Sequence, residues 1–286
     1  MTSLRPVTQI IRAVSLTEGA DMPVRRGFAA HGGVFLDPFL MLDHFGPAAI
    51  GPHSKGFPPH PHKGFETVTY MISGAIEHHD SFGGHAIVGP GDVQWMTAGS
   101  GIVHSETPPA ELRQSGGTVE GLQVWINLPE RKKTLSPGYE MVRAAELPRY
   151  RSRTGDVEGL VIAGALPDAV GAVAPKSPLT LAVVTLAQGA RFALPLPGDW
   201  QAGIYVAHGA LMAGEHAAQD GHTLIFGKGH GDVVVTATTP STILVMAGQP
   251  LGEPVVARGP FVMTTEDETR QAMLDYQAGR FGVLAG

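Results

Sequence analysis

Two short segments carry the residues best suited to bind a metal ion, His60-Pro61-His62 and His104-Ser105-Glu106. In each segment two potential ligands stand at positions i and i+2, so on an extended backbone both side chains project to the same face. Pro61, between the two histidines, favours a strand entry or a sheet edge. Two such pairs that converge inside one β-barrel would offer three imidazoles and one carboxylate to a single cation.

The chain contains no cysteine, so any metal site must use nitrogen and oxygen donors. Three histidines and one carboxylate differ from closed structural zinc sites, which are usually rich in cysteine, and resemble the open sites of divalent iron that activate oxygen. Turns at residues 89–92 and 98–101 separate the two pairs and would let the second fold back over the first. Solvated loop histidines are the alternative for His60 and His62, and the second pair of ligands argues against it.

Short strands are the elements that must position these ligands. Only 16% of the 286 residues are charged, while 38 glycines and 23 prolines favour many short elements joined by tight turns. Stretches that are rich in β-branched residues and bounded by Gly, Pro or Asp recur at close spacing, which is typical of strands. They include residues 67–72, 86–88, 93–96, 122–126, 179–186, 203–206 and 233–237. The sequence therefore predicts an all-β fold of barrels or sandwiches.

One helix is predicted, near the C-terminal end of the chain. Thr265 stands three residues before Glu268, which is the spacing of a capping box, and Gly279 lies where a helix would stop. We expect the helix over residues 266–278.

A weak internal repeat relates the two halves of the chain. Tyr70 and Gly74-Ala75-Ile76 match Tyr205 and Gly209-Ala210-Leu211 at a constant offset of 135 residues. Repetition at this scale indicates a duplicated fold.

The boundary between the two copies is expected within residues 128–139. This stretch is polar and contains two prolines and a glycine, which is typical of a connection between domains. We therefore predict an N-terminal domain over residues 1–135 and a C-terminal domain over residues 136–286.

The second copy lacks the candidate ligands. Applied to the first histidine pair and to Glu66, the offset reaches Pro195, Pro197 and Gln201. The matching late strand, expected at Ser241–Met246, contains neither His nor Glu. One metal per chain is therefore predicted.

Several motifs of this chain resemble those of the pirin family. The most specific are His60-Pro61-His62-Lys63-Gly64-Phe65-Glu66, the stretch PGDVQWMTAG at residues 90–99, and His104-Ser105-Glu106. Further matches lie at residues 37–39, 43–45, 259–263 and 276–279, so the resemblance spans nearly the whole chain.

The resemblance to pirins implies a bicupin, with two cupin jelly-roll β-barrels and a C-terminal α-helix. The metal site would lie in the N-terminal barrel, residues 1–135, and the barrel of residues 136–286 would have no metal ligands. The resemblance implies one Fe(2+) ion, held by His60, His62, His104 and Glu106. Manganese, cobalt, nickel and copper ions also suit these donors.

Glu66 is a second carboxylate near the first histidine pair. Many cupins take their carboxylate ligand from this position, whereas the resemblance to pirins assigns that role to Glu106. Glu66 shares the strand parity of His60 and His62 if no bulge intervenes at Gly64. Two interpretations are open: Glu66 lies beside the ligands and orients their imidazoles, or it is a polar residue that bonds the turn at Gly64.

The resemblance also implies an activity of the quercetin 2,3-dioxygenase type, in which a flavonol such as quercetin is cleaved with O2 and carbon monoxide is released. Glu106 would accept the proton of the metal-bound flavonol hydroxyl, and the three histidines would hold the metal. Two alternatives remain. One is a metal- and redox-responsive binding protein that acts on a transcription factor or a metabolic enzyme. The other is a metal-dependent isomerase or epimerase that works without O2.

Charge and hydropathy argue against other classes of partner. The net charge of −6, the pI of about 6.1 and the scattered basic residues give no footprint for direct nucleic-acid binding. No stretch is long and apolar enough to cross a membrane, and the first 18 residues lack the apolar run of a signal peptide. We expect a cytoplasmic protein.

The remaining histidines are expected at the surface. Neighbouring residues of a strand point to opposite faces, so His78-His79-Asp80 is interpreted as a solvated hairpin end. Surface or turn positions are expected for His85, His208, His216, His222 and His230.

Overall fold

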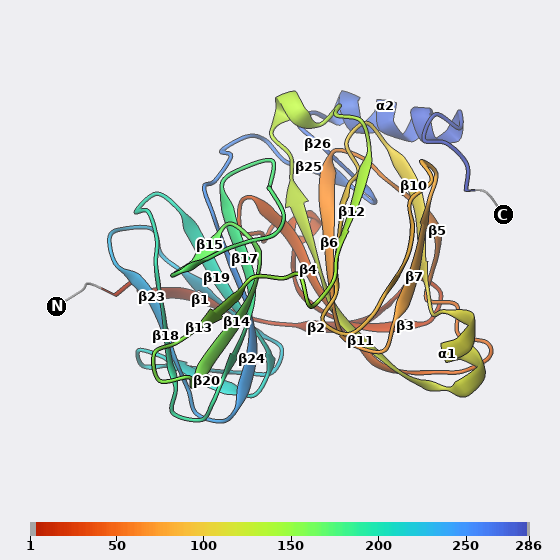
Figure 1. The fold of residues 1–286 in the computed structure, drawn as a ribbon. Coiled ribbons are helices and arrows are strands. Elements are labelled where there is room, and N and C mark those ends of the chain that lie inside the picture. The colour runs from red at the N-terminus through yellow and green to blue at the C-terminus, as the bar shows by residue number, and fades with distance from the viewer. Residues whose placement is uncertain (1–3, 285–286) are drawn as a thin grey trace. The chain divides into compact units, whose positions relative to one another are not determined.

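The computed structural model describes residues 4–284, and β-strands dominate it (Figure 1). The chain forms two compact units. We call residues 14–35, 39–144 and 252–284 the first barrel, and residues 4–13, 36–38 and 145–251 the second barrel. The prediction of an all-β fold with one C-terminal helix is confirmed.

The first barrel consists of two antiparallel sheets. The larger has the strand order β12-β9-β6-β11-β4-β3-β2, and the smaller has the order β5-β10-β7-β8. The larger sheet comprises β2 (Val14–Glu18), β3 (Met22–Ala29), β4 (Phe39–Ile50), β6 (Phe65–Ser73), β9 (Val93–Thr97), β11 (Gly117–Asn127) and β12 (Gly138–Val142). The smaller sheet comprises β5 (Phe57–His62), β7 (Ile76–Asp80), β8 (His85–Val88) and β10 (Ile102–Thr107).

Shorter elements complete this barrel. They are the 3-10 helices Ala30–Gly32 and Glu130–Lys132, helix α1 (Ala110–Ser115), β25 (Val256–Arg258), β26 (Phe261–Met263) and helix α2 (Glu266–Gln277). Helix α2 begins with the predicted capping box, in which the Thr265 hydroxyl accepts the Glu268 amide and the Glu268 carboxylate accepts the Thr265 amide. Its Ala272 packs with Val103, Phe261 and Phe281 of the same barrel.

The second barrel repeats this topology. Its sheets have the orders β1-β22-β19-β24-β17-β14-β13 and β18-β23-β20-β21. The larger sheet comprises β1 (Val7–Arg12), β13 (Arg149–Arg151), β14 (Val157–Ala163), β17 (Leu179–Leu186), β19 (Gln201–His208), β22 (His222–Phe226) and β24 (Ser241–Gly248). The smaller comprises β18 (Arg191–Pro195), β20 (Ala210–Ala213), β21 (His216–Gln219) and β23 (Asp232–Ala237), and a separate hairpin joins β15 (Ala165–Leu166) to β16 (Ala169–Val170). Strand β19 has the same place in its sheet as β6 has in the first barrel. The predicted repeat agrees with this, because Tyr70 lies on β6 and its match Tyr205 lies on β19.

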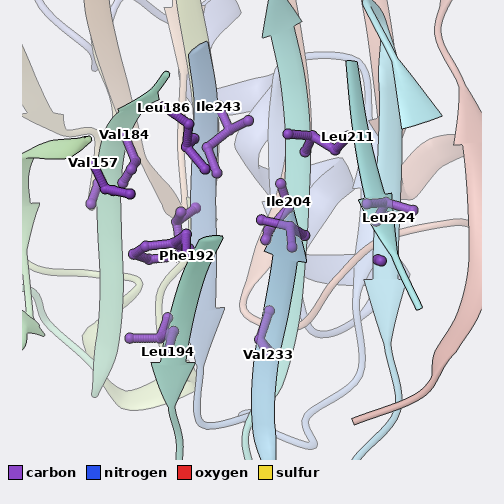
Figure 2. Packing of buried hydrophobic residues seen from close by; sticks show 14 of the residues in the cluster. Val157, Val184, Leu186, Phe192, Leu194, Ile204, Leu211, Leu224, Val233 and Ile243 are labelled. Atoms are coloured by element: carbon purple, nitrogen blue, oxygen red, sulfur yellow. The ribbon is translucent and has the colours of Figure 1, made fainter. Parts of the chain in front are cut away.

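Apolar side chains fill the second barrel (Figure 2). Strands β18 and β23 correspond to β5 and β10, and they bury Phe192, Leu194, Val233 and Val235 there. The uniform offset misplaced these counterparts, because the β18–β19 connection is longer than the β5–β6 connection. Likewise, Ser241–Met246 belongs to β24, the counterpart of β11 and not of β10.

The ends of the chain join the opposite units. Strand β1 pairs with β22, so residues 4–13 belong to the second barrel, although the sequence-based division placed them in residues 1–135. Residues 252–284 belong to the first barrel, where the Val262 amide bonds the Lys63 carbonyl at 3.0 Å. In the middle of the chain the change of unit falls between Ala144 and Ala145.

Neither α-helix within residues 4–284 has the length and apolar character that crossing a bilayer requires.

Candidate metal centre

Two neighbouring strands bring three of the predicted ligands together. His60 and His62 lie on β5, and His104 lies on β10, directly opposite His60 in the antiparallel register. The ring centroids lie 4.3 Å apart for His60 and His104, 4.8 Å for His60 and His62, and 4.9 Å for His62 and His104. One ring nitrogen from each histidine lies within 4.8 Å of the other two.

The position of β5 explains why its sequence tolerates three prolines. Strand β5 is an edge strand of the four-stranded sheet, where a missing amide does not interrupt the ladder. The edge position indicated by Pro61 is therefore confirmed. The sequence alternation then directs both histidines toward the interior.

The three imidazoles have unused nitrogens that suit a metal ion. Nδ1 of His62 and Nε2 of His104 are buried and have no hydrogen-bond partner within residues 4–284. His60 uses Nδ1 to bond the Pro58 carbonyl at 2.7 Å, which leaves its Nε2 for another contact. Buried polar atoms without a partner are costly, and imidazole nitrogens are common ligands of divalent transition metals. The donor set therefore fits such an ion.

The histidines are also held in the protonation state that ligands need. Burial lowers the pKa of His62 and of His104 well below the usual value of 6.5, and the neighbouring His60 lowers both further. Their imidazoles are consequently neutral at pH 7, with a lone pair available on one nitrogen. Trp125 and Phe65 pack edge-on against His62, each with its centroid 5.1 Å away, and limit the rotation of that ring.

Glu106 lies beside this group but is held by other partners. Its carboxylate belongs to a second group with His104 and His78, in which the ligand atoms also lie within 4.8 Å of one another. Oε1 accepts hydrogen bonds from Thr69 at 3.3 Å and from Gln94, and Oε2 accepts one from Gln123 at 3.0 Å. These donors hold the carboxylate in one orientation.

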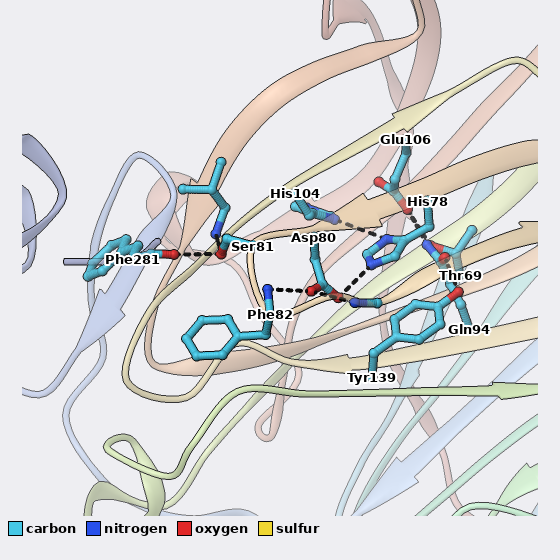
Figure 3. Close-up of polar contacts among 12 residues, drawn as sticks. Thr69, His78, Asp80, Ser81, Phe82, Gln94, His104, Glu106, Tyr139 and Phe281 are labelled. Atoms are coloured by element: carbon cyan, nitrogen blue, oxygen red, sulfur yellow. Dashed lines mark hydrogen bonds and ion pairs between the residues drawn. The ribbon is translucent and has the colours of Figure 1, made fainter. Parts of the chain in front are cut away.

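The orientation of both glutamines is fixed by aromatic donors. The Tyr139 hydroxyl donates to Oε1 of Gln94 at 3.2 Å, and Nε1 of Trp125 donates to Oε1 of Gln123 at 3.2 Å. Each amide must therefore turn its NH2 group toward Glu106. Figure 3 shows the Tyr139, Gln94 and Glu106 part of this network.

A cavity of about 640 Å3 opens from His60, His62 and Glu106. Met41, Phe57 and Trp125 are among its apolar lining residues. Its volume lies within the usual range of small-molecule sites, about 300–1,000 Å3.

Part of the cavity wall is charged. The Arg26 guanidinium makes two bonds to Asp43, at 2.7 and 2.8 Å, and one to Glu18 at 2.8 Å. Burial lowers the pKa of Arg26, but the bonds and charges of the two carboxylates outweigh it, so its pKa is raised. Burial raises the pKa of Asp43, and the bonds from Arg26 offset this only in part. The cavity thus offers polar groups in addition to the histidines.

Two further residues of the site were missed by the sequence analysis. The prediction of a solvated hairpin end was wrong for His78 and Asp80, which are 0% and 7% exposed. Strand β7 lies between β10 and β8, and burial alternates along it, so that His78 and Asp80 share the buried face. His79 does point the other way and is partly exposed with His85 and Glu77. The parity argument was therefore correct, and the strand's position within its sheet was the missing information.

Glu66 does not lie where the sequence suggested. Its carboxylate accepts bonds from Trp95 at 2.9 Å and from Thr97 at 2.7 Å. It points to the face of β6 opposite Thr69, the residue that contacts Glu106. Gly64, at φ +90°, interrupts the strand before Glu66, so the parity of His62 is not carried across it.

The paired sheets and the histidine-lined pocket together define the chain as a bicupin with a candidate metal site in one of its barrels. Family models match both halves: the pirin model covers residues 22–126, and the model of the pirin C-terminal cupin domain covers residues 181–282. The chain belongs to the pirin family.

Individual relatives agree with this assignment. A pirin-like protein of Caulobacter vibrioides is 40% identical over 283 residues, covering 97% of this chain and 99% of the relative. Human pirin is 37% identical over 289 residues, covering 99% of this chain and 96% of human pirin. A crystal structure of quercetin 2,3-dioxygenase from Acinetobacter baumannii is 33% identical and superimposes with a TM-score of 0.93, covering 98% of this chain and 99% of that one.

Proposed function

We propose that this protein is a non-haem, iron(II)-dependent dioxygenase that cleaves flavonols such as quercetin with O2. The observation that carries the proposal is the group of three histidines with unused nitrogens next to a cavity of about 640 Å3. The related Acinetobacter baumannii structure, named as a quercetin 2,3-dioxygenase, supports the choice of substrate class.

In the proposed site His60, His62 and His104 hold the iron, and Glu106 is the fourth ligand. When bound, the ion supplies Lewis acidity that lowers the pKa of a coordinated substrate hydroxyl. Other divalent transition metals would suit the same donors, and elemental analysis of protein from its native host identifies the resident one.

Glu106 has a second role in this proposal, as acceptor of the flavonol hydroxyl proton. Its Oε1 is held by Thr69 and Gln94, whereas Oε2 is held by Gln123. Oε2 is therefore the oxygen better able to take the proton. The donors around Glu106 limit its movement, so proton transfer requires the hydroxyl to approach Oε2 directly.

The cavity walls would select a flat, oxygen-bearing substrate. Trp125 and Phe57 offer aromatic faces or edges to the rings, and the group of Glu18, Arg26 and Asp43 offers hydrogen bonds to hydroxyls of the substrate. Bound substrate against the apolar residues of the lining would also limit the access of water to the reacting centre.

Oxygen consumption by the purified, iron-loaded protein with a panel of flavonols tests this proposal. We expect turnover with flavonols and none with His104→Ala, which lacks one ligand. Full iron occupancy without turnover would contradict the dioxygenase and favour the alternative of a metal-responsive protein that binds a protein partner. Turnover of another substrate without O2 would instead indicate an isomerase or epimerase.

A further inference from the structure

His104 contacts a buried chain of polar residues formed by His78 and Asp80 (Figure 3). Both residues come from β7, which pairs with β10 so that Asp80 stands opposite His104 and His78 stands opposite Glu106.

Asp80 is a fixed hydrogen-bond acceptor. Its Oδ1 accepts the backbone amides of Phe82 at 2.8 Å and Gly84 at 3.0 Å, and its Oδ2 contacts Nε2 of His78 at 3.0 Å. Burial raises the pKa of Asp80, but the bonds from His78 and the two amides outweigh burial and lower it. The carboxylate is therefore ionised, and Nε2 of His78 must carry the hydrogen.

The state of His78 determines the state of His104. When His78 is neutral, with its hydrogen on Nε2 toward Asp80, its Nδ1 has only a lone pair. That Nδ1 lies 3.5 Å from Nδ1 of His104, a long contact in which His104 must be the donor. His104 consequently carries its hydrogen on Nδ1, and its lone pair is on Nε2, the buried atom that has no partner within residues 4–284.

Stacking fixes the plane of the His78 ring. Tyr139 lies parallel to it, with ring centroids 4.1 Å apart and an interplanar angle of 15°. The same Tyr139 donates its hydroxyl to Gln94, which in turn donates to Glu106. The neighbours of His104 and those of Glu106 are therefore held by one aromatic residue.

We infer that Asp80 and His78 are positioning residues that fix the tautomer of His104 and direct its Nε2 lone pair into the proposed metal site. This inference rests on the proposed function for the identity of the bound group. The order of hydrogens along Asp80, His78 and His104 is independent of it. Partners of this kind behind a metal-binding histidine typically contribute about 10- to 100-fold to metal affinity.

The variant Asp80→Asn tests the order of hydrogens, because it keeps the shape of the side chain and reverses one bond. Its Oδ1 can still accept the amides of residues 82 and 84, while its NH2 group would donate to Nε2 of His78. His78 would then carry its hydrogen on Nδ1 and oppose the hydrogen on Nδ1 of His104. We expect His104 to change to the tautomer with its hydrogen on Nε2.

Nitrogen-15 NMR of histidine-labelled, metal-free protein reads the tautomer directly, with the His104 signals assigned by their loss in His104→Ala. Isothermal titration with iron(II) under anaerobic conditions gives the second readout, an affinity loss of about 10- to 100-fold. Asp92→Asn is the matched control, because Asp92 is also a buried carboxylate that accepts backbone amides, those of Gly89 and Ala144, outside this chain of contacts.

His104 that keeps its hydrogen on Nδ1 in Asp80→Asn would overturn the inference. An iron affinity that falls no further in Asp80→Asn than in Asp92→Asn would also overturn it. If Asp80→Asn does not fold, His78→Phe keeps a flat ring against Tyr139, removes the acceptor, and is expected to give His104 a mixture of tautomers. The NMR readout needs neither metal nor turnover, so it separates failure of this inference from failure of the proposed dioxygenase.

Discussion

At the scale of single residues, the main feature of the candidate site is a pair of buried imidazole nitrogens that have no hydrogen-bond partner within residues 4–284. Each such buried nitrogen costs about 1–3 kcal/mol, and the fold contains two of them within one ligand cluster, on His62 and His104. The neutral imidazoles of His62 and His104 and the amides that donate to Glu106 are already oriented in the folded chain. Folding therefore preorganises the donor groups, and metal binding requires little further ordering of their side chains.

Glu106→Gln separates the two roles proposed for Glu106. Three histidines remain to hold iron, but the side chain no longer accepts a proton, so kcat should fall by about 10² to 10⁴. Steady-state oxygen consumption, with iron content measured on the same sample, checks this expectation. Glu77→Gln, a change in a partly exposed carboxylate of β7, is the control and should leave kcat unchanged. Wild-type turnover in Glu106→Gln would remove the proton-accepting role.

At the scale of elements, Lys133 ties the β5–β6 connection to β26. Its ammonium donates to the Gly64 carbonyl at 2.8 Å, to Oδ1 of Asn127 at 2.6 Å and to the Val262 carbonyl at 3.0 Å. Gly64 directly follows the segment that carries His60 and His62, and a Cβ at this position would clash with the Val262 carbonyl. Strand β26 and the end of β5 are thus fixed together.

Lys133→Met should destabilise the first barrel, because it leaves three buried acceptors without their donor. We expect a loss of about 2–4 kcal/mol in the free energy of unfolding, measured by urea denaturation at pH 7. Arg131→Met, at an exposed position nearby, should change it by less than about 0.5 kcal/mol. Equal stability of the two variants would contradict a tethering role for Lys133.

The same residue gives a defined pH dependence. Burial lowers the pKa of Lys133 from 10.5 to about 8. Between these two values the unfolded chain binds a proton that the folded chain has lost, so the contribution of this group to stability rises with pH. The difference in unfolding free energy between wild type and Lys133→Met should therefore grow from pH 8 to pH 10. A difference that shrinks over this range would show that the pKa is not lowered.

The sequence predicted those features of the strands that depend on spacing alone. The i and i+2 pairs identified His60, His62 and His104, and Pro61 indicated an edge strand. The sequence-based prediction failed where burial depends on the elements packed around a strand. His78 and Asp80 lie on the buried face of β7, and no local pattern reports that this polar face is turned into the barrel.

Glu66 shows a different limit of the sequence. Its expected parity depended on an uninterrupted strand, and the backbone at Gly64 breaks that strand. Sequence spacing therefore located the candidate ligands of β5 and β10, which lie together, better than it located the residues around them.

At the scale of the whole molecule, the duplicated topology holds two different interiors. One barrel buries histidines and a polar network, and the other buries an apolar cluster at the corresponding strands. A uniform repeat offset could not place these counterparts, because the connections differ in length. It also could not foresee that each terminal segment joins the opposite unit.

Phe281 tests the contribution of the C-terminal segment to the site. This residue is 1% exposed and packs on Val103. The Ser81 hydroxyl links the two residues, because it accepts the Val103 amide and donates to the Phe281 carbonyl. Phe281→Ala should cost about 3–5 kcal/mol and, because Val103 precedes His104, should also weaken iron(II) binding. Phe192→Ala, in the core of the second barrel, should cost a similar amount and leave iron affinity unchanged. An equal loss of iron affinity in both variants would argue against a local effect.

The central claim, that three histidines hold one metal ion in the first barrel, is tested most directly by X-ray diffraction from iron-loaded crystals at the iron absorption edge. We predict a single anomalous peak per chain, within coordination distance of one ring nitrogen each from His60, His62 and His104. A peak elsewhere in the chain, or none despite full iron content in solution, would contradict the claim.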